Sequence, residues 1–248
     1  VLEFCQQYGE YLTVKIENMS LQHNSNNEEE HPAVVEKDHE AHAERKKYGV
    51  IAVASGDGLK QTFLDLGCDV VVDGGQSMNP SAETFLEAFD RVNADTIFVF
   101  PNNGNIILTA HQAAKLYPDS DIRVIESHTI GDGYAALSMF APETGDADAM
   151  VADLNEAMAG VVTAEISRCV RDANMDGTEL KIGDFIGFAG KKLLASGTDR
   201  LKTVCDTVDN MGIRDYDICI VVCGKDGTAE EVYRSSSLYK SEWFSLSE

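Results

Sequence analysis

A regular alternation of short apolar runs and amphipathic segments between residues 48 and 140 constrains the fold of this chain more than any other feature. Four runs, YGVIAVA, DVVVDG, DTIFVFP and DIRVIES, have the length and the β-branched composition of buried strands. They are followed in turn by helix-like segments: GLKQTFLDLG, PSAETFLEAFDRV, NIILTAHQAAKLY and TIGDGYAALSMF. Strands and helices at this spacing predict βαβ units, a parallel sheet and right-handed crossovers.

The pattern changes near residue 145, where we expect a second lobe. A helix is predicted over GDADAMVADLNEAMAG, then short strands separated by glycines, with a hairpin turn at Asp176-Gly177. A helix over DRLKTVCDTVDNMG and a buried strand over YDICIVVCG complete this half. The fold class is therefore predicted as α/β: a parallel Rossmann-like α/β lobe over 47–145 and an α+β lobe with antiparallel strands over 146–248.

The first 46 residues lie outside both predicted lobes. Residues 1–20 are predicted to form a helix and a strand, too short to fold alone, and are expected to be the tail of a preceding domain. Residues 21–46, rich in Asn, Glu and His, are predicted to be a polar, solvated linker. Four of the six histidines fall in this linker: His23, His31, His39 and His42. A metal-binding tract is the alternative, but their spacing fits no standard site, so we predict no metal.

Net charge and cysteine usage limit the classes of partner. The formal net charge of -22 would repel nucleic acid and anionic membrane surfaces, so we expect neither as a partner. No apolar run approaches the roughly 20 residues that span a bilayer. The six cysteines are scattered in apolar context without a CxxC pair, which is typical of reduced thiols in a cytoplasmic protein. We therefore expect a cytoplasmic location.

Small polar residues follow the predicted strands of the first lobe. We group them as the rim residues: Ser55, Gln76, Ser77, Asn79, Ser81, Asn102, Asn103 and Thr129. In a parallel sheet these turns lie along one edge, together with helix N-termini that suit a carboxylate, a phosphate or a polar head group. The alternative is that each residue only caps its own helix. Asn79, for example, is predicted to cap a helix that begins at Pro80.

The same turns do not match the common catalytic motifs. In the loop Ser55-Gly56-Asp57-Gly58, Gln61 stands where a dinucleotide fingerprint has its third glycine. Neither a GxxxxGK[ST] loop nor a GxSxG elbow is present in the sequence. His128 follows a predicted strand, but no carboxylate or nucleophile is identifiable beside it. We therefore predict no catalytic residue.

Four segments carry a resemblance to a known family: YGVIAVASGDGL, VVVDGGQSMNPSAETFLEAF, FVFPNNGNIILTAHQAA and VRDANMDGTELKIGDFIGFAGKKLLASG. In this order they resemble the C-terminal region of the kinase subunit of bacterial fatty acid kinase, which is a dihydroxyacetone-kinase-like family. The leading segment VLEFCQQYGEYLTVKIENMSLQH resembles the last helix and strand of the middle domain of that subunit. The resemblance runs through most of the chain from Val1 to Gly224.

This resemblance implies a fold similar to that of DegV-type fatty-acid-binding proteins. It implies that the region docks a separate DegV-type protein and brings the bound fatty acid to a kinase domain. ATP and Mg belong to that kinase domain, which this sequence does not match, so we expect no cofactor and no kinase activity here. In DegV-type binders, hydroxyl residues on strand-end loops hold the acyl carboxylate. Here those loops carry Ser77, Asn79 and Ser81, and then Asn102 and Asn103 in place of a Ser-rich turn.

Three functions follow from these observations. A non-catalytic docking module is the function that the resemblance favours. The second is a carrier that binds a fatty acid directly between its two lobes, which requires an apolar tunnel because burial of each methylene contributes about 0.8 kcal/mol. The third is an enzyme that acts on a small anionic substrate at the rim.

Overall fold

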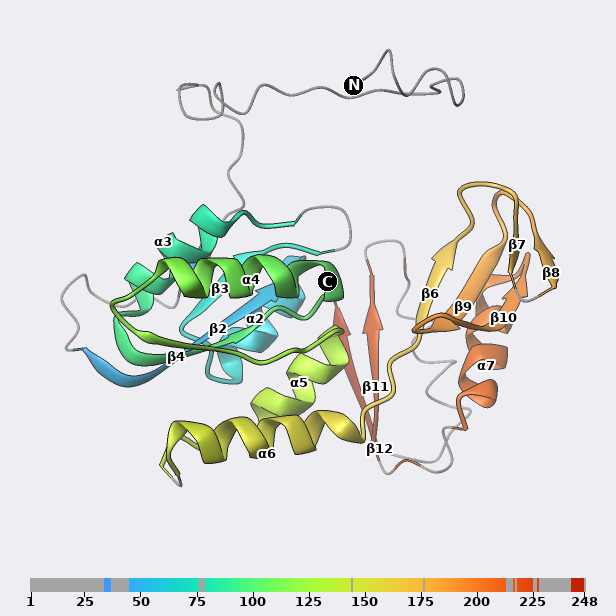
Figure 1. The fold of residues 1–248 in the computed structure, drawn as a ribbon. Coiled ribbons are helices and arrows are strands. Elements are labelled where there is room, and N and C mark those ends of the chain that lie inside the picture. The colour runs from blue at the N-terminus through green and yellow to red at the C-terminus, as the bar shows by residue number, and fades with distance from the viewer. Residues whose placement is uncertain are drawn as a thin grey trace, which may run out of the picture. The chain divides into compact units, whose positions relative to one another are not determined.

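The computed structural model of the chain describes residues 34–36, 45–75, 79–143, 145–175, 177–212, 216, 218–224, 227 and 242–247. Its largest sheet has five strands in the order β1-β3-β2-β4-β5 (Figure 1). The bounds of these strands are Val34–Glu36 for β1, Lys46–Ala54 for β2, Val70–Asp73 for β3, Ala94–Phe100 for β4 and Asp121–Val124 for β5. Strands β2 to β5 pair in parallel, which confirms the predicted parallel sheet.

Strand β1 pairs antiparallel with β3, with Val34 opposite Val72. The sequence predicts a solvated linker over these residues, and for Val34–Glu36 that prediction is wrong. Two adjacent valines beside a β-branched edge strand favour pairing even within a polar segment. The predictions for residues 1–33 and 37–44, including the four linker histidines, fall outside the described residues.

Helices cover both faces of this sheet. Their bounds are Asp57–Asp65 for α2, Ala82–Val92 for α3, Gly104–Leu116 for α4, Ile130–Ser138 for α5 and Ala147–Ala159 for α6. Successive residues of β2 alternate between the faces: Val50 and Ala52 pack with α2, α5 and α6, whereas Ile51 and Val53 pack with α3 and α4 (Figure 1). Both faces are therefore buried, as expected for parallel strands with apolar runs.

Helix α6 packs on the core of the parallel lobe. Met150 and Leu154 are at most 4 % exposed and join the cluster formed with α2 and α5. The predicted division at residue 145 assigns this helix to the segment 146–248 instead. The division itself stays a prediction, but the contacts of α6 are with the first lobe.

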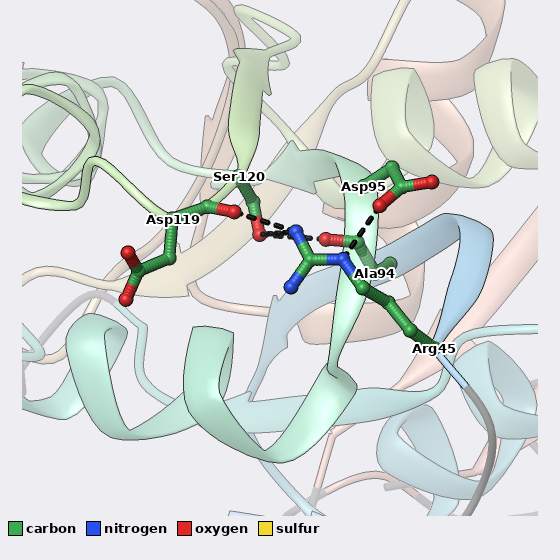
Figure 2. A network of polar contacts seen from close by, with 5 residues as sticks. All are labelled: Arg45, Ala94, Asp95, Asp119 and Ser120. Atoms are coloured by element: carbon green, nitrogen blue, oxygen red, sulfur yellow. Dashed lines mark hydrogen bonds and ion pairs between the residues drawn. The ribbon is translucent and has the colours of Figure 1, made fainter.

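A polar cluster closes the amino edge of the sheet (Figure 2). The Arg45 guanidinium donates to the Asp95 carboxylate at the start of β4 and to the carbonyl oxygen of Asp119. It also lies 3.4 Å from Ser120 Oγ, and that hydroxyl donates to the carbonyl oxygen of Ala94 at 2.6 Å. Arg45 thus joins the beginnings of β2, β4 and β5, and the opposite, carboxyl edge is held by different contacts.

The second lobe has an antiparallel sheet in the order β10-β9-β6, as predicted. The elements of this half are β6 Glu165–Arg168, β7 Ala173–Met175, β8 Thr178–Leu180, β9 Phe185–Ala189, β10 Lys192–Gly197, α7 Arg200–Asn210, β11 Ile218–Cys223 and β12 Glu242–Ser247. Strands β7 and β8 form a hairpin through Gly177, which has a positive φ of 82°.

Close packing holds α7 against this sheet. A Cβ atom at Gly187 of β9 would lie 1.8 Å from Thr207 Oγ1, so the helix requires a glycine beneath it. Strand β11 was predicted to be buried, but Ile218 is 61 % exposed and Val222 is 39 % exposed, so the prediction of burial is wrong. β11 pairs only with β12 among the described residues, so its apolar pattern does not mark a position inside a larger sheet. Across the described part of the chain, every helix is too short or too polar to cross a bilayer.

Candidate functional site

The carboxyl edge of the parallel sheet is the candidate site. From β2 the chain passes to β3 on one side and then to β4 on the other side, so β2 and β4 flank the point where the strand order reverses. Open α/β sheets bind ligands at this point, outside the carboxyl ends of the strands. The last β2–β4 pair is Ala52 with Phe100, and the rim residues begin immediately beyond it.

Asn102 fills the space between the two flanking strands. Its side-chain Nδ2 donates to the carbonyl oxygen of Val53 at 2.9 Å, and its backbone N–H donates to Ser127 Oγ at 2.9 Å. The Ser127 hydroxyl in turn donates to Asn102 Oδ1 at 2.8 Å. Asn102 is 5 % exposed and Ser127 is fully buried, so these bonds replace contacts with water. The network joins the ends of β2, β4 and β5.

The backbone of Asn102 has a left-handed conformation with φ of 54°, which Asn tolerates better than most residues. Helix α5 lies directly against its amide group. A Cβ atom at Gly133 of α5 would lie 1.8 Å from Asn102 Oδ1 and 2.6 Å from Asn102 Cγ. A glycine at position 133 is therefore what allows α5 to cover this amide.

Three other rim residues cap the helices that follow them. Ser81 Oγ accepts from the Thr84 N–H at 3.2 Å, and Asn103 Oδ1 accepts from the Asn105 N–H at 2.9 Å. Thr129 Oγ1 accepts from the Asp132 N–H at 3.1 Å, and the Asp132 carboxylate accepts from the Thr129 N–H at 2.9 Å, which completes a capping box. These contacts match the alternative in which rim residues cap their own helices.

The predicted cap at Asn79 is wrong. Helix α3 begins at Ala82 with Ser81 as its N-cap, and Asn79 is exposed two residues before that cap. Pro80 is buried and precedes the cap instead of occupying the first helical position. Both Asn79 and Ser81 are good capping residues, and the chain uses the one whose hydroxyl reaches Thr84.

The remaining rim residues lie at the same edge or outside the described chain. Ser55 is exposed, and a Cβ atom at Gly75 would lie 3.3 Å from Ser55 Cβ, so the turns after β2 and β3 touch. A Cβ atom at Gly104 would lie 3.3 Å from His128 Nδ1, so the turns after β4 and β5 also touch. Gln76 and Ser77 fall outside the described residues. The structure therefore brings together the turns of all four parallel strands, and a binding role for the rim residues stays a prediction.

An ion pair at this edge was missed in the sequence. Lys60 Nζ lies 2.8 Å from Asp73 Oδ2, with side-chain exposures of 9 % and 19 %. Lys60 comes from the first turns of α2 and Asp73 ends β3, so the pair fastens a helix to a neighbouring strand. A lysine in an amphipathic helix usually indicates a solvated position, and only the position of Asp73 in the folded sheet reveals the pair.

The side chains at this edge favour recognition over bond-breaking chemistry. Asn102, Asn103, Ser81 and Thr129 are already engaged in structural hydrogen bonds, while Ser55 and Asn79 are exposed. His128 donates its backbone N–H to Asp132 at 2.9 Å, and its ring is exposed beside Gly104. The arrangement gives a fixed surface of neutral polar groups at the sheet edge.

Comparison with known proteins extends this description. The model of the FakA-like C-terminal family of fatty acid kinase matches residues 49–244. Protein YloV of Bacillus subtilis is 37 % identical over 232 residues, which cover 93 % of this chain and 41 % of that protein. An uncharacterized protein of Staphylococcus aureus strain USA300 is 30 % identical over 231 residues, covering 91 % of this chain and 40 % of that one. The chain therefore spans about two fifths of the length of these relatives.

Solved structures with a similar fold come from dihydroxyacetone kinase systems. The dihydroxyacetone kinase operon co-activator Dha-DhaQ aligns with a TM-score of 0.55 and 14 % identity, covering 83 % of this chain and 78 % of that one. The dihydroxyacetone kinase of C. freundii in complex with AMP-PNP and Mg2+ aligns with a TM-score of 0.53 and 15 % identity, covering 84 % of this chain and 45 % of that one. At these identities the similarity establishes the fold alone.

Proposed function

The chain belongs to the FakA-like C-terminal family of fatty acid kinase, and we propose that it acts there as a non-catalytic docking module. In this proposal it binds a DegV-type fatty-acid-binding protein in the bacterial cytoplasm. The bound fatty acid is then presented to an ATP domain of the same kinase polypeptide, which phosphorylates it. The partner, the fatty acid and the ATP domain are all parts of the proposal.

The observation that supports a docking role most directly is the hydrogen bonding of Asn102. Its amide, the best-placed polar group at the reversal of strand order, is buried and bonded to Val53 and Ser127. A residue that binds substrate at this point would need a free donor or acceptor facing solvent. The carboxyl edge is instead braced from within, which suits a surface that must keep its shape when a partner binds.

The residues at this edge do not fit ATP and Mg. Asp57 lies in the first turn of α2, where its charge would oppose a phosphate group at the helix N-terminus. Lys60, the neighbouring cation, is paired with Asp73. We therefore derive no phosphoryl-transfer step at this site and assign the nucleotide to the separate kinase domain.

Binding between the purified chain and a DegV-type protein loaded with fatty acid tests the proposal. Isothermal titration calorimetry should give a saturable one-to-one interaction. Ser55→Trp, a bulky change at an exposed rim position, should weaken it, whereas Ser138→Trp, at an exposed position on α5, should leave it unchanged. An absence of binding by the unmodified chain would refute the docking role.

Mass spectrometry of the chain purified alone distinguishes the carrier alternative. A docking module should release no fatty acid when it is denatured. Stoichiometric fatty acid in the chain itself would favour the carrier function and count against docking as the main role.

A further inference from the structure

Helix α4 presents two leucines to solvent on a single stripe. Leu108 is 67 % exposed and Leu116 is 64 % exposed, and the exposed Gln112 lies midway between them at four-residue spacing. Residues four apart share one face of a helix. The opposite stripe, Ile106, Ala110 and Ala113, already supplies the core and is fully buried. One exposed leucine is ordinary, but two on one stripe of a helix that needs no second apolar face call for an explanation.

The helix beside α4 is held firmly to it. The rings of Phe89 on α3 and Tyr117 after α4 meet edge to face with centroids 5.3 Å apart. The Tyr117 hydroxyl donates to Asp90 Oδ1 on α3 at 2.8 Å. Burial of the ring, together with this bond and the negative charge of Asp90, raises the pKa of Tyr117 to about 12. The outer surfaces of α3 and α4 therefore form one preformed face.

Acidic residues line the α3 part of this face. Glu83, Glu87 and Asp90 are exposed at spacings of four and three residues, so they fall along one side of α3. The basic residues of the two helices, Arg91 and Lys115, both lie in last turns. The face thus combines an aliphatic stripe with an acidic row.

We propose that this outer face of α3 and α4 is where a protein partner docks, through aliphatic side chains bordered by Lys and Arg. The inference rests on the proposed docking function and names the surface that performs it. Basic residues around an apolar patch would complement the acidic row and steer association. A second copy of this chain would bring its own acidic row and a net charge of -22 against the same face, and an anionic membrane would be repelled by it.

Paired lysine substitutions test the surface. Leu108→Lys with Leu116→Lys removes both aliphatic contacts and adds charge that repels a basic partner. Lysine has a helix propensity close to that of leucine, and both positions are exposed, so the fold should persist. The control is Val170→Lys with Ile182→Lys in the second lobe, where the two aliphatic side chains are 84 % and 69 % exposed.

Calorimetric titration with the fatty-acid-loaded DegV-type protein should show the difference. The α4 variant should bind at least about 30-fold more weakly, as expected when central apolar contacts are lost, and the control variant should bind within about 2-fold of the unmodified chain. Glu87→Lys should slow association and reduce the dependence of binding on salt.

The outcomes separate the two proposals. Binding by the unmodified chain that the α4 substitutions leave intact would overturn this surface while preserving the docking function. No binding by the unmodified chain would overturn both. Sedimentation equilibrium of the chain alone provides the remaining outcome: self-association abolished by the α4 substitutions would make a second copy the occupant and overturn the assignment to a different protein.

Discussion

Asn102 and Ser127 bond to each other twice: the backbone N–H of Asn102 donates to Ser127 Oγ at 2.9 Å, and that hydroxyl donates to Asn102 Oδ1 at 2.8 Å. The reciprocal pair closes a buried connection between the turn after β4 and the turn after β5. The Nδ2 bond to Val53 extends it to β2. Substitutions at this edge and in the helix layer beside it should therefore have measurable effects on stability.

Asn102→Ala should be strongly destabilising. It leaves Val53 without its side-chain donor and Ser127 without an acceptor, and it places a Cβ-bearing residue without Asn's tolerance at a φ of 54°. Loss of buried partners costs about 1–3 kcal/mol each, so we expect a loss of about 2–4 kcal/mol in the free energy of unfolding, measured with urea. Asn79→Ala, at an exposed position, should change it by less than about 0.5 kcal/mol.

Gly133→Ala should also destabilise the chain, although alanine normally favours a helix over glycine by about 0.5–1 kcal/mol. The new methyl group would lie 1.8 Å from Asn102 Oδ1, so the amide must leave its bonding position. We expect a loss of about 1–3 kcal/mol by the same measurement. Gly160→Ala, where no atom lies within 4 Å of the added Cβ, should be neutral or mildly stabilising, and a similar result at position 133 would contradict the close approach.

Lys60→Met should leave Asp73 without its partner and lower the free energy of unfolding by about 2–4 kcal/mol, as expected for breaking a mostly buried ion pair. Adding Asp73→Asn removes the remaining charge and should restore part of that loss. A double-mutant cycle should therefore give a coupling of about 1–3 kcal/mol between the two positions. Additive losses would show that the pair contributes no coupling.

Tyr117 should make stability fall at high pH. Its folded pKa is raised from 10.0 to about 12, chiefly by burial and then by Asp90, so the unfolded chain loses this proton first as pH rises. The stabilisation is complete below pH 10 and is lost as the pH rises towards 12. Urea unfolding across that range should show this decline, and Tyr117→Phe should lack its contribution while losing about 1 kcal/mol at neutral pH with the Asp90 bond.

Local pattern was sufficient to predict the parallel lobe. The apolar runs of β2, β3 and β4 and the faces of α3 and α4 depend on residues within one element, and alternation with helices determined the parallel pairing. The hairpin between β7 and β8 followed from its Asp-Gly turn in the same way.

Positions that depend on contacts between distant segments were not predictable. Asn102 has the sequence context of an exposed loop, and its burial requires both Gly133 of α5 and Ser127 after β5. The Lys60–Asp73 pair joins a helix to the following strand and has no periodic signature. The choice of Ser81 over Asn79 as the cap depended on where α3 starts, which the propensities of the two residues do not decide.

The Arg45 cluster at the amino edge has a mechanical consequence. Its guanidinium binds Asp95 and Asp119, at the beginnings of β4 and β5, so a pull on the chain ahead of β2 is shared among three strands at once. Tension or domain motion on that side would meet the clamp before it reached the Asn102 network at the far end of the strands. The face that greets a partner is thereby insulated from the movements of whatever precedes it.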